Sequence, residues 1–202
     1  MLNYLFPIAM FTDVNKEIVA AAQKIFEECP PNSIRSAESS PGMRTTLQEG
    51  YSPMKTKVDW DPLHSEVSAP LINYIKESVN QFCQEADYAK HEIIISNMWL
   101  NEMYKGSQHP AHTHYGYTLS GVFYVDVPDN SGKIMFHHPQ DTTCTPFIRN
   151  VSKWALHNSL SWWVPVETGS IIIFPANLRH SVPALDFDGA RRSIAFDIVL
   201  IP

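Results

Sequence analysis

No run of apolar residues in this sequence is long enough for a membrane-spanning helix, which needs about 20 of them in succession. The N-terminal segment is apolar, but no basic residue precedes its hydrophobic stretch, and Asp13 and Lys16 interrupt it. That pattern is not typical of a signal peptide, so we expect a first strand there instead. These absences predict a cytoplasmic protein without a membrane partner.

Cysteine is scarce, and no two cysteines are spaced as a pair. Cys29, Cys83 and Cys144 form no CxxC motif and are odd in number, which argues against a disulfide framework and favours reduced thiols. Basic residues are also few, because 15 Lys and Arg stand against 21 Asp and Glu, giving a formal net charge of −6. We therefore expect no nucleic-acid partner, since such proteins usually carry basic patches.

Motifs for hydrolysis are missing as well. The carboxylates include no closely spaced acid and base pair, and no nucleophile elbow supports a Ser-His-Asp arrangement. What the sequence does contain is an ordinary globular balance of 44% hydrophobic and 18% charged residues over 202 positions. Its length suits a single domain over residues 1–202, with 1–90 as helical support and 91–202 as the core.

Two helices are expected in the first half of the chain. Apolar residues at three- and four-residue steps predict one helix over 15–28, ended by Pro30-Pro31, and a second over 62–86. Between them, residues 32–57 are polar with two turn signals, so we expect a loop with room for one short strand, in a position where a lid over the site could lie.

From residue 91 the sequence changes to short segments rich in β-branched and aromatic residues, separated by turn residues. This pattern predicts a mainly β fold with flanking helices: a double-stranded β-helix (jelly roll) with the N-terminal helices packed on one sheet. The expected strands are IIISNMWLNEMY, YTLSGVFYVDV, GKIMFHH, SWWVPV, GSIIIFP and RRSIAFDIVLIP.

Histidines are concentrated in the stretch His109-Pro110-Ala111-His112-Thr113-His114. On an extended strand, His112 and His114 would share one face, because side chains alternate with period two. Two imidazoles that converge on one point begin a first-row transition-metal site. The best third candidate is His180, which follows an apolar strand over Ser170–Phe174. We expect these three histidines to hold one iron.

Taken together, several motifs resemble the iron(II)/2-oxoglutarate dioxygenases, in particular the prolyl-hydroxylase-like branch and its small bacterial and phage members. The resemblance spans Asn97–Ile198 and rests on Tyr104-Lys105-Gly106, HPAHTH, SGVFYVDVPDNSGKIMF, GSIIIFPANLRHSV and RRSIAFDI. It implies that His112 is the first metal ligand and His180 the last. His114 stands where this family usually has Asp or Glu, so an all-imidazole site would carry one negative charge fewer.

The resemblance also implies a site for 2-oxoglutarate. Arg191 and Ser193 form the Arg-x-Ser pair that holds the far carboxylate, with Arg192 as the alternative to Arg191. Strand alternation favours Arg191, because Ser193 and Ala195 on its face leave room for a ligand. Tyr124 matches a tyrosine that reaches 2-oxoglutarate. His109 has two open interpretations. It either contacts the cosubstrate, or it lies behind the metal ligands or in a loop without such a contact.

The resemblance further implies an enzyme that uses Fe(II), 2-oxoglutarate and O2 to hydroxylate a peptide or small molecule, with prolyl hydroxylation as the first candidate by analogy. Asn97 and Trp99 would line the cavity. Two alternatives stay open: a cupin-like three-histidine dioxygenase that needs no 2-oxoglutarate, and a non-catalytic jelly-roll binding module. A homodimer is also left open.

Overall fold

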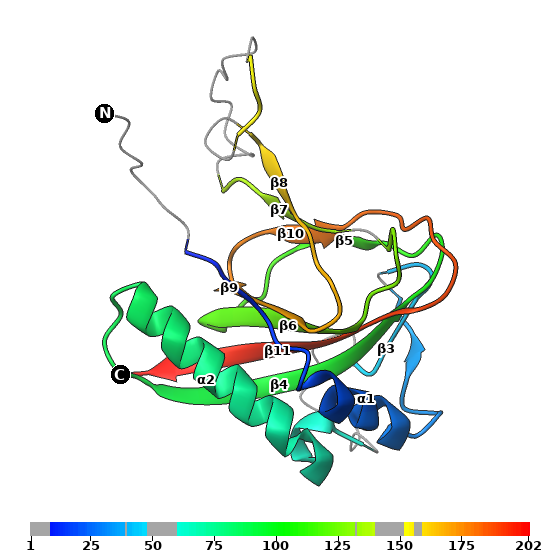
Figure 1. Cartoon of the computed structure of the whole chain (residues 1–202), viewed down its shortest axis with the longest axis horizontal. Coiled ribbons are helices and arrows are strands. Elements are labelled where there is room, and N and C mark those ends of the chain that lie inside the picture. The colour runs from blue at the N-terminus through cyan, green and yellow to red at the C-terminus, as the bar shows by residue number, and fades with distance from the viewer. Residues whose placement is uncertain (1–8, 39, 48–59, 132, 140–151, 156–158) are drawn as a thin grey trace.

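The computed structural model describes residues 9–38, 40–47, 60–131, 133–139, 152–155 and 159–202 of the chain. Helices α1 and α2 belong to the N-terminal half, and strands follow one another from Glu92 onward (Figure 1). In chain order the elements are β1 (Phe11–Val14), α1 (Val19–Glu28), β2 (Arg35–Ser36), β3 (Met43–Thr45), the 3-10 turns η1 (Pro62–His64) and η2 (Glu66–Ser68), α2 (Ala69–Glu85), β4 (Glu92–Met103), β5 (His109–His112), β6 (Leu119–Asp126), β7 (Ile134–His137), β8 (Ser161–Val164), β9 (Ser170–Pro175), β10 (His180–Val182) and β11 (Arg191–Ile201).

The strands form two antiparallel sheets. The larger sheet has the order β1-β9-β6-β11-β4-β3-β2 and the smaller one the order β5-β10-β7-β8. In Figure 1, α1 and α2 lie against the larger sheet, and the smaller sheet lies on its other side. The predicted double-stranded β-helix with helices packed on one sheet is thereby confirmed, and each of the six expected strand segments contains an observed strand.

Strand β11 shows how the larger sheet divides its two faces. Ile194 and Phe196 are fully buried and belong to the hydrophobic core that α2 shares with the outer face of the sheet. Arg191, Ser193 and Asp197 alternate with them and are buried on the inner face, toward the smaller sheet. The strand therefore carries an apolar row for the helices and a polar row for the interior of the jelly roll.

Gly121 on β6 leaves room for the ring of Phe196 on β11. It is the register partner of Phe196, and a Cβ atom at Gly121 would overlap the Phe196 ring and the carbonyl oxygen of Ile172. A side chain at this position would therefore displace the Phe196 ring and crowd the backbone of β9.

Both helices begin later than predicted. The chain before α1 makes an Asx turn, in which the Glu17 N–H donates to Oδ1 of Asn15, so the helix begins at Val19. The segment from Pro62 is divided into η1 and η2, and α2 begins at Ala69. Pro70 explains the division, because proline is tolerated in the first turn of a helix but not in its interior.

The remaining N-terminal predictions are partly testable. β1 lies within the expected first strand, whereas residues 1–8 lie outside the described residues. The expected loop contains two short strands, β2 and β3, where one was expected, and they pair with each other. The predicted lid falls partly on residues 48–57, which are also outside the described residues. None of the described helices is long and apolar enough to cross a membrane.

Candidate metal centre

The histidine cluster forms where two short strands of the smaller sheet pair. His112 ends β5 and His180 begins β10, and the two are direct register partners across this pair. His114 lies two residues beyond the end of β5, where its backbone N–H donates to the carbonyl oxygen of Ala176 at 2.8 Å. One potential ligand nitrogen from each of the three rings lies within 4.8 Å of the others. Three imidazoles thus converge on one point.

This geometry corrects one detail of the sequence prediction. His112 and His114 are not both on a strand, because β5 ends at His112. His180 reaches the cluster by strand pairing, with its ring centroid 4.3 Å from that of His112 and 5.2 Å from that of His114. The predicted trio is therefore brought together, although His114 is placed by its own backbone contact.

Hydrogen bonds fix which nitrogen is free to bind a metal in two of the three rings. Nδ1 of His112 lies 2.8 Å from the carbonyl oxygen of Pro110, and Nδ1 of His180 lies 3.0 Å from that of Leu178. A carbonyl oxygen can only accept, so each Nδ1 carries the hydrogen and each Nε2 keeps a free lone pair. Nδ1 of His114 likewise lies 2.8 Å from the carboxylate of Asp197. Metal-ligating histidines are held by contacts of this kind.

Burial favours the neutral form of two histidines in the cluster, His112 and His180. It lowers the pKa of His180 well below its ordinary value, and the neighbouring His112 lowers it further. Burial also lowers the pKa of His112. Neutral imidazoles can donate a lone pair to a metal, whereas imidazolium ions cannot. His112 and His180 are thus in the protonation state that metal binding requires at neutral pH.

Two aromatic rings flank the cluster. The ring of His109 stacks on His112 at 4.1 Å between centroids, and burial lowers the pKa of His109 to about 3. Trp99 stacks on His114 at 5.8 Å. Both sequence candidates therefore lie against the predicted ligands, and His109 forms part of the wall behind His112.

Arg191 is buried on the inner face of β11. Its side chain is almost inaccessible, since the residue is 2% exposed, and its guanidinium carbon lies 4.9 Å from the ring centroid of Tyr124. Nε and Nη1 of Arg191 have no hydrogen-bond partner within the part of the chain that the structure describes. Ser193, two residues along the same face, is the register partner of Tyr124. The three side chains predicted to hold 2-oxoglutarate thus lie together.

A buried guanidinium without an anionic partner is costly, because burial removes its hydration without replacing it. The unpartnered nitrogens of Arg191 are donors in the fixed planar arrangement that suits a carboxylate. This interior donor group therefore fits a carboxylate-bearing ligand such as 2-oxoglutarate.

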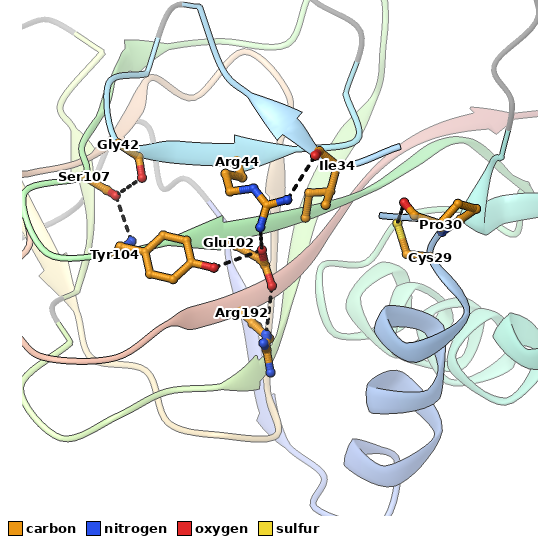
Figure 2. Close-up of polar contacts among 9 residues, drawn as sticks. All are labelled: Cys29, Pro30, Ile34, Gly42, Arg44, Glu102, Tyr104, Ser107 and Arg192. Atoms are coloured by element: carbon orange, nitrogen blue, oxygen red, sulfur yellow. Dashed lines mark hydrogen bonds and ion pairs between the residues drawn. The ribbon is translucent and has the colours of Figure 1, made fainter. Parts of the chain in front are cut away.

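Arg192 is directed away from this interior. Its Nε donates to Oε1 of Glu102 at 3.1 Å, and the same carboxylate accepts hydrogen bonds from Arg44 at 3.0 Å and from the hydroxyl of Tyr104 at 3.1 Å (Figure 2). Between the two sequence alternatives, the geometry favours Arg191, because Arg192 already has a carboxylate partner on the opposite face of β11.

Sequence reasoning missed Asp197. Its carboxylate contacts His114, and the Asn97 amide donates to its other oxygen at 3.4 Å. The signal was present in RRSIAFDI, where period-two alternation places Asp197 on the face of Arg191 and Ser193. A charged residue on the inner face of such a strand indicates that the interior contains a polar site.

Comparison with known proteins agrees with this geometry. Residues 97–197, half of the chain, match the model of a family described as "Putative 2OG-Fe(II) oxygenase". The chain belongs to this family of oxygenases. The matched range contains all of the histidines in the cluster as well as Arg191. A search of curated proteins gave no significant match.

Solved structures of 2OG-Fe(II) oxygenases share the fold at low sequence identity. A family member from Burkholderia pseudomallei is 12% identical with a TM-score of 0.64, over 95% of this chain and 84% of that one. HygX from Streptomyces hygroscopicus, with nickel, 2-oxoglutarate and hygromycin B bound, is 11% identical with a TM-score of 0.63, over 95% and 83%. A prolyl-4-hydroxylase from Pseudomonas putida is 11% identical with a TM-score of 0.60, over 95% and 92%.

Proposed function

We propose that this protein is an Fe(II)/2-oxoglutarate-dependent dioxygenase that hydroxylates a C–H bond of a peptide or small-molecule substrate. The observation that carries the proposal is the presence of two features in one interior: three converging imidazoles, and a buried guanidinium without an anionic partner among the described residues. The imidazoles would bind iron, and the guanidinium would bind the far carboxylate of 2-oxoglutarate.

In this proposal, His112, His114 and His180 hold the iron through Nε2. Hydrogen bonds at Nδ1 keep the rings of His112 and His180 in orientation, and the Asp197 carboxylate contacts Nδ1 of His114. Three nitrogen donors leave open coordination positions for the cosubstrate. With both bound, iron, 2-oxoglutarate and O2 supply the oxidation: 2-oxoglutarate is decarboxylated to succinate and CO2, and one oxygen atom enters the substrate C–H bond.

Arg191 is proposed to bind the far carboxylate of 2-oxoglutarate through its unpartnered nitrogens, with Ser193 beside it on β11. Tyr124 forms the wall under the guanidinium, and its buried hydroxyl is a further donor. His109 covers the outer side of His112 and, by the resemblance, donates to the same cosubstrate. Because these groups are buried, they bind the cosubstrate in a water-poor interior where hydrogen bonds to charge are strong.

Prolyl and other peptide substrates come first by resemblance, and the fold likeness to a prolyl-4-hydroxylase supports that choice. A small-molecule substrate is the second option, supported by the likeness to HygX with hygromycin B bound. Fold alone does not determine a substrate, so the class of substrate rests on analogy.

Anaerobic titration of the apoprotein with Fe(II) and then 2-oxoglutarate tests the proposal. We expect a weak visible charge-transfer band in the wild type that is lost in Arg191→Ala and in His180→Ala. Arg192→Ala is the matched control, because it removes the neighbouring arginine on the opposite face of β11, and we expect it to keep the band.

The other outcomes separate the competing functions. Iron binding without a band in the wild type would favour a three-histidine dioxygenase that uses no 2-oxoglutarate. No iron binding at all would leave a non-catalytic binding module. The buried Arg191, which has no anionic partner among the described residues, argues against a dioxygenase without 2-oxoglutarate, since that enzyme would leave the charge without a ligand.

A further inference from the structure

The groups that face Nδ1 of the three histidines are not equivalent. His112 and His180 donate to backbone carbonyl oxygens, which are neutral. Nδ1 of His114 instead lies 2.8 Å from Oδ1 of Asp197, a carboxylate, with 13% and 4% of the two side chains exposed. A buried carboxylate is therefore in direct contact with the histidine that stands where the resembling enzymes usually have a carboxylate ligand.

The larger sheet is built to hold this carboxylate. Asp197 is the register partner of Asn97 on β4 and of Ser120 on β6. Ser120 donates its hydroxyl hydrogen to Oδ1 of Asp197 at 2.7 Å, and the Asn97 amide donates to Oδ2 at 3.4 Å. Both flanking strands thus direct the carboxylate, and among the described residues no lysine or arginine forms an ion pair with it.

We propose that Asp197 is a positioning residue that delivers, through His114, the negative charge which an Asp or Glu ligand would otherwise give the iron. The inference rests on the proposed iron site. The negative charge would come from Asp197, which contacts the ligand His114, and not from a carboxylate bound directly to the iron.

The physical argument concerns charge and orientation. Three neutral imidazoles leave the full double charge of a ferrous ion uncompensated in a buried site, where uncompensated charge is costly. A carboxylate that accepts the Nδ1 hydrogen of a ligating histidine fixes the ring and raises the basicity of its Nε2. With Asp197 included, iron and its protein surroundings carry the same net charge as in a site with two histidines and one carboxylate.

Titration of the apoprotein with Ni(II), followed by calorimetry at one neutral pH, tests this without any turnover. Asp197→Asn keeps the shape and an acceptor oxygen for His114 but removes the charge. We expect it to weaken Ni(II) binding roughly 10- to 100-fold, the usual cost of losing a group that supports a metal ligand. We expect Asp197→Ala to lose at least as much.

The midpoint potential of the iron-loaded protein gives a second readout. Ferric iron is stabilised more than ferrous iron by nearby negative charge, so Asp197→Asn should raise the potential. Ser120→Ala removes a hydrogen bond to Asp197 but leaves its charge, so both readouts should change less than in Asp197→Asn. Glu102→Gln, which removes a buried carboxylate on the outer face of the same sheet, controls for loss of buried charge alone.

Two results would overturn the inference. If Asp197→Asn matches the wild type in affinity and potential while Asp197→Ala does not, the residue acts through shape and not through charge. If Glu102→Gln weakens Ni(II) binding as much as Asp197→Asn, the effect is a general loosening of the sheet. A wild type that binds neither Ni(II) nor Fe(II) would instead overturn the proposed function, and this inference with it.

Discussion

Arg191 and Arg192 are neighbours on β11, yet their guanidinium groups lie on opposite faces of the larger sheet. Arg191 is buried in the interior, with Nε and Nη1 unpartnered among the described residues. Arg192 pairs with Glu102 on the helix side at 3.1 Å. Arg192 therefore contributes to structure, whereas Arg191 places in the interior a charge that no described residue compensates.

The buried charge of Arg191 predicts a conflict between stability and binding. Arg191→Met fills a similar volume without a charge, so we expect the free energy of unfolding of the apoprotein to rise by roughly 1–3 kcal/mol. The Ni(II)-loaded wild type should gain about 2.7 kcal/mol from 2-oxoglutarate at 100 times its Kd, and the variant should gain almost nothing. Urea denaturation with and without 2-oxoglutarate measures both effects. A destabilised Arg191→Met apoprotein would contradict the prediction.

Much of this site could be predicted because strand alternation is a local rule. Period-two alternation in RRSIAFDI predicted Arg191 on the inner face of the sheet and Ile194 and Phe196 against the helices, and the structure has them there. Dense β-branched segments likewise predicted the strands of the jelly roll, because their side chains fit a pleated sheet.

The remaining features depend on contacts between distant segments. The pairing of β5 with β10, which brings His180 to His112, follows from the topology of the whole jelly roll and not from either segment. His114 is placed by a hydrogen bond to Ala176 after its strand has ended. Strand alternation could assign Asp197 to the inner face, but its contact with His114 could be found only from the structure.

Gly121 offers a test of the contact between β6 and β11. Gly121→Ala places a methyl group against the Phe196 ring and the Ile172 carbonyl, so we expect a loss of about 1–3 kcal/mol in the free energy of unfolding. Chemical denaturation measures the loss. In the double variant Gly121→Ala/Phe196→Leu, the smaller leucine side chain should relieve the overlap. The double variant should therefore lose less free energy of unfolding than the sum of the losses of the two single variants. Additive losses would show that the overlap is not with Phe196.

The ring and the hydroxyl of Tyr124 can be tested separately at the site of Arg191. Tyr124→Phe keeps the ring under the guanidinium but removes the hydroxyl, whose pKa burial raises. We expect the apparent Kd for 2-oxoglutarate to rise about tenfold, the value of one hydrogen bond to a charged group, while Fe(II) affinity stays unchanged. Titration of the charge-transfer band measures the first quantity and metal titration the second. Unchanged 2-oxoglutarate binding would exclude Tyr124 from the cosubstrate site.

His109 predicts how the stability of the apoprotein depends on pH. Burial lowers the pKa of His109 to about 3 from an ordinary 6.5, so the unfolded chain takes up a proton in a range where the folded chain does not. The stabilisation from this residue is present above pH 6.5 and is lost as the pH falls from there toward about 3. The free energy of unfolding should fall by up to about 1.4 kcal/mol per pH unit from His109 alone. His109→Gln should make that slope shallower, whereas His64→Gln, at a histidine whose side chain is 78% exposed, should not. Urea midpoints of the chelator-treated protein between neutral pH and pH 4 measure both slopes. Equal slopes for His109→Gln and the wild type would mean that His109 is protonated in the folded protein, and it could then not lie buried against His112 as the structure has it.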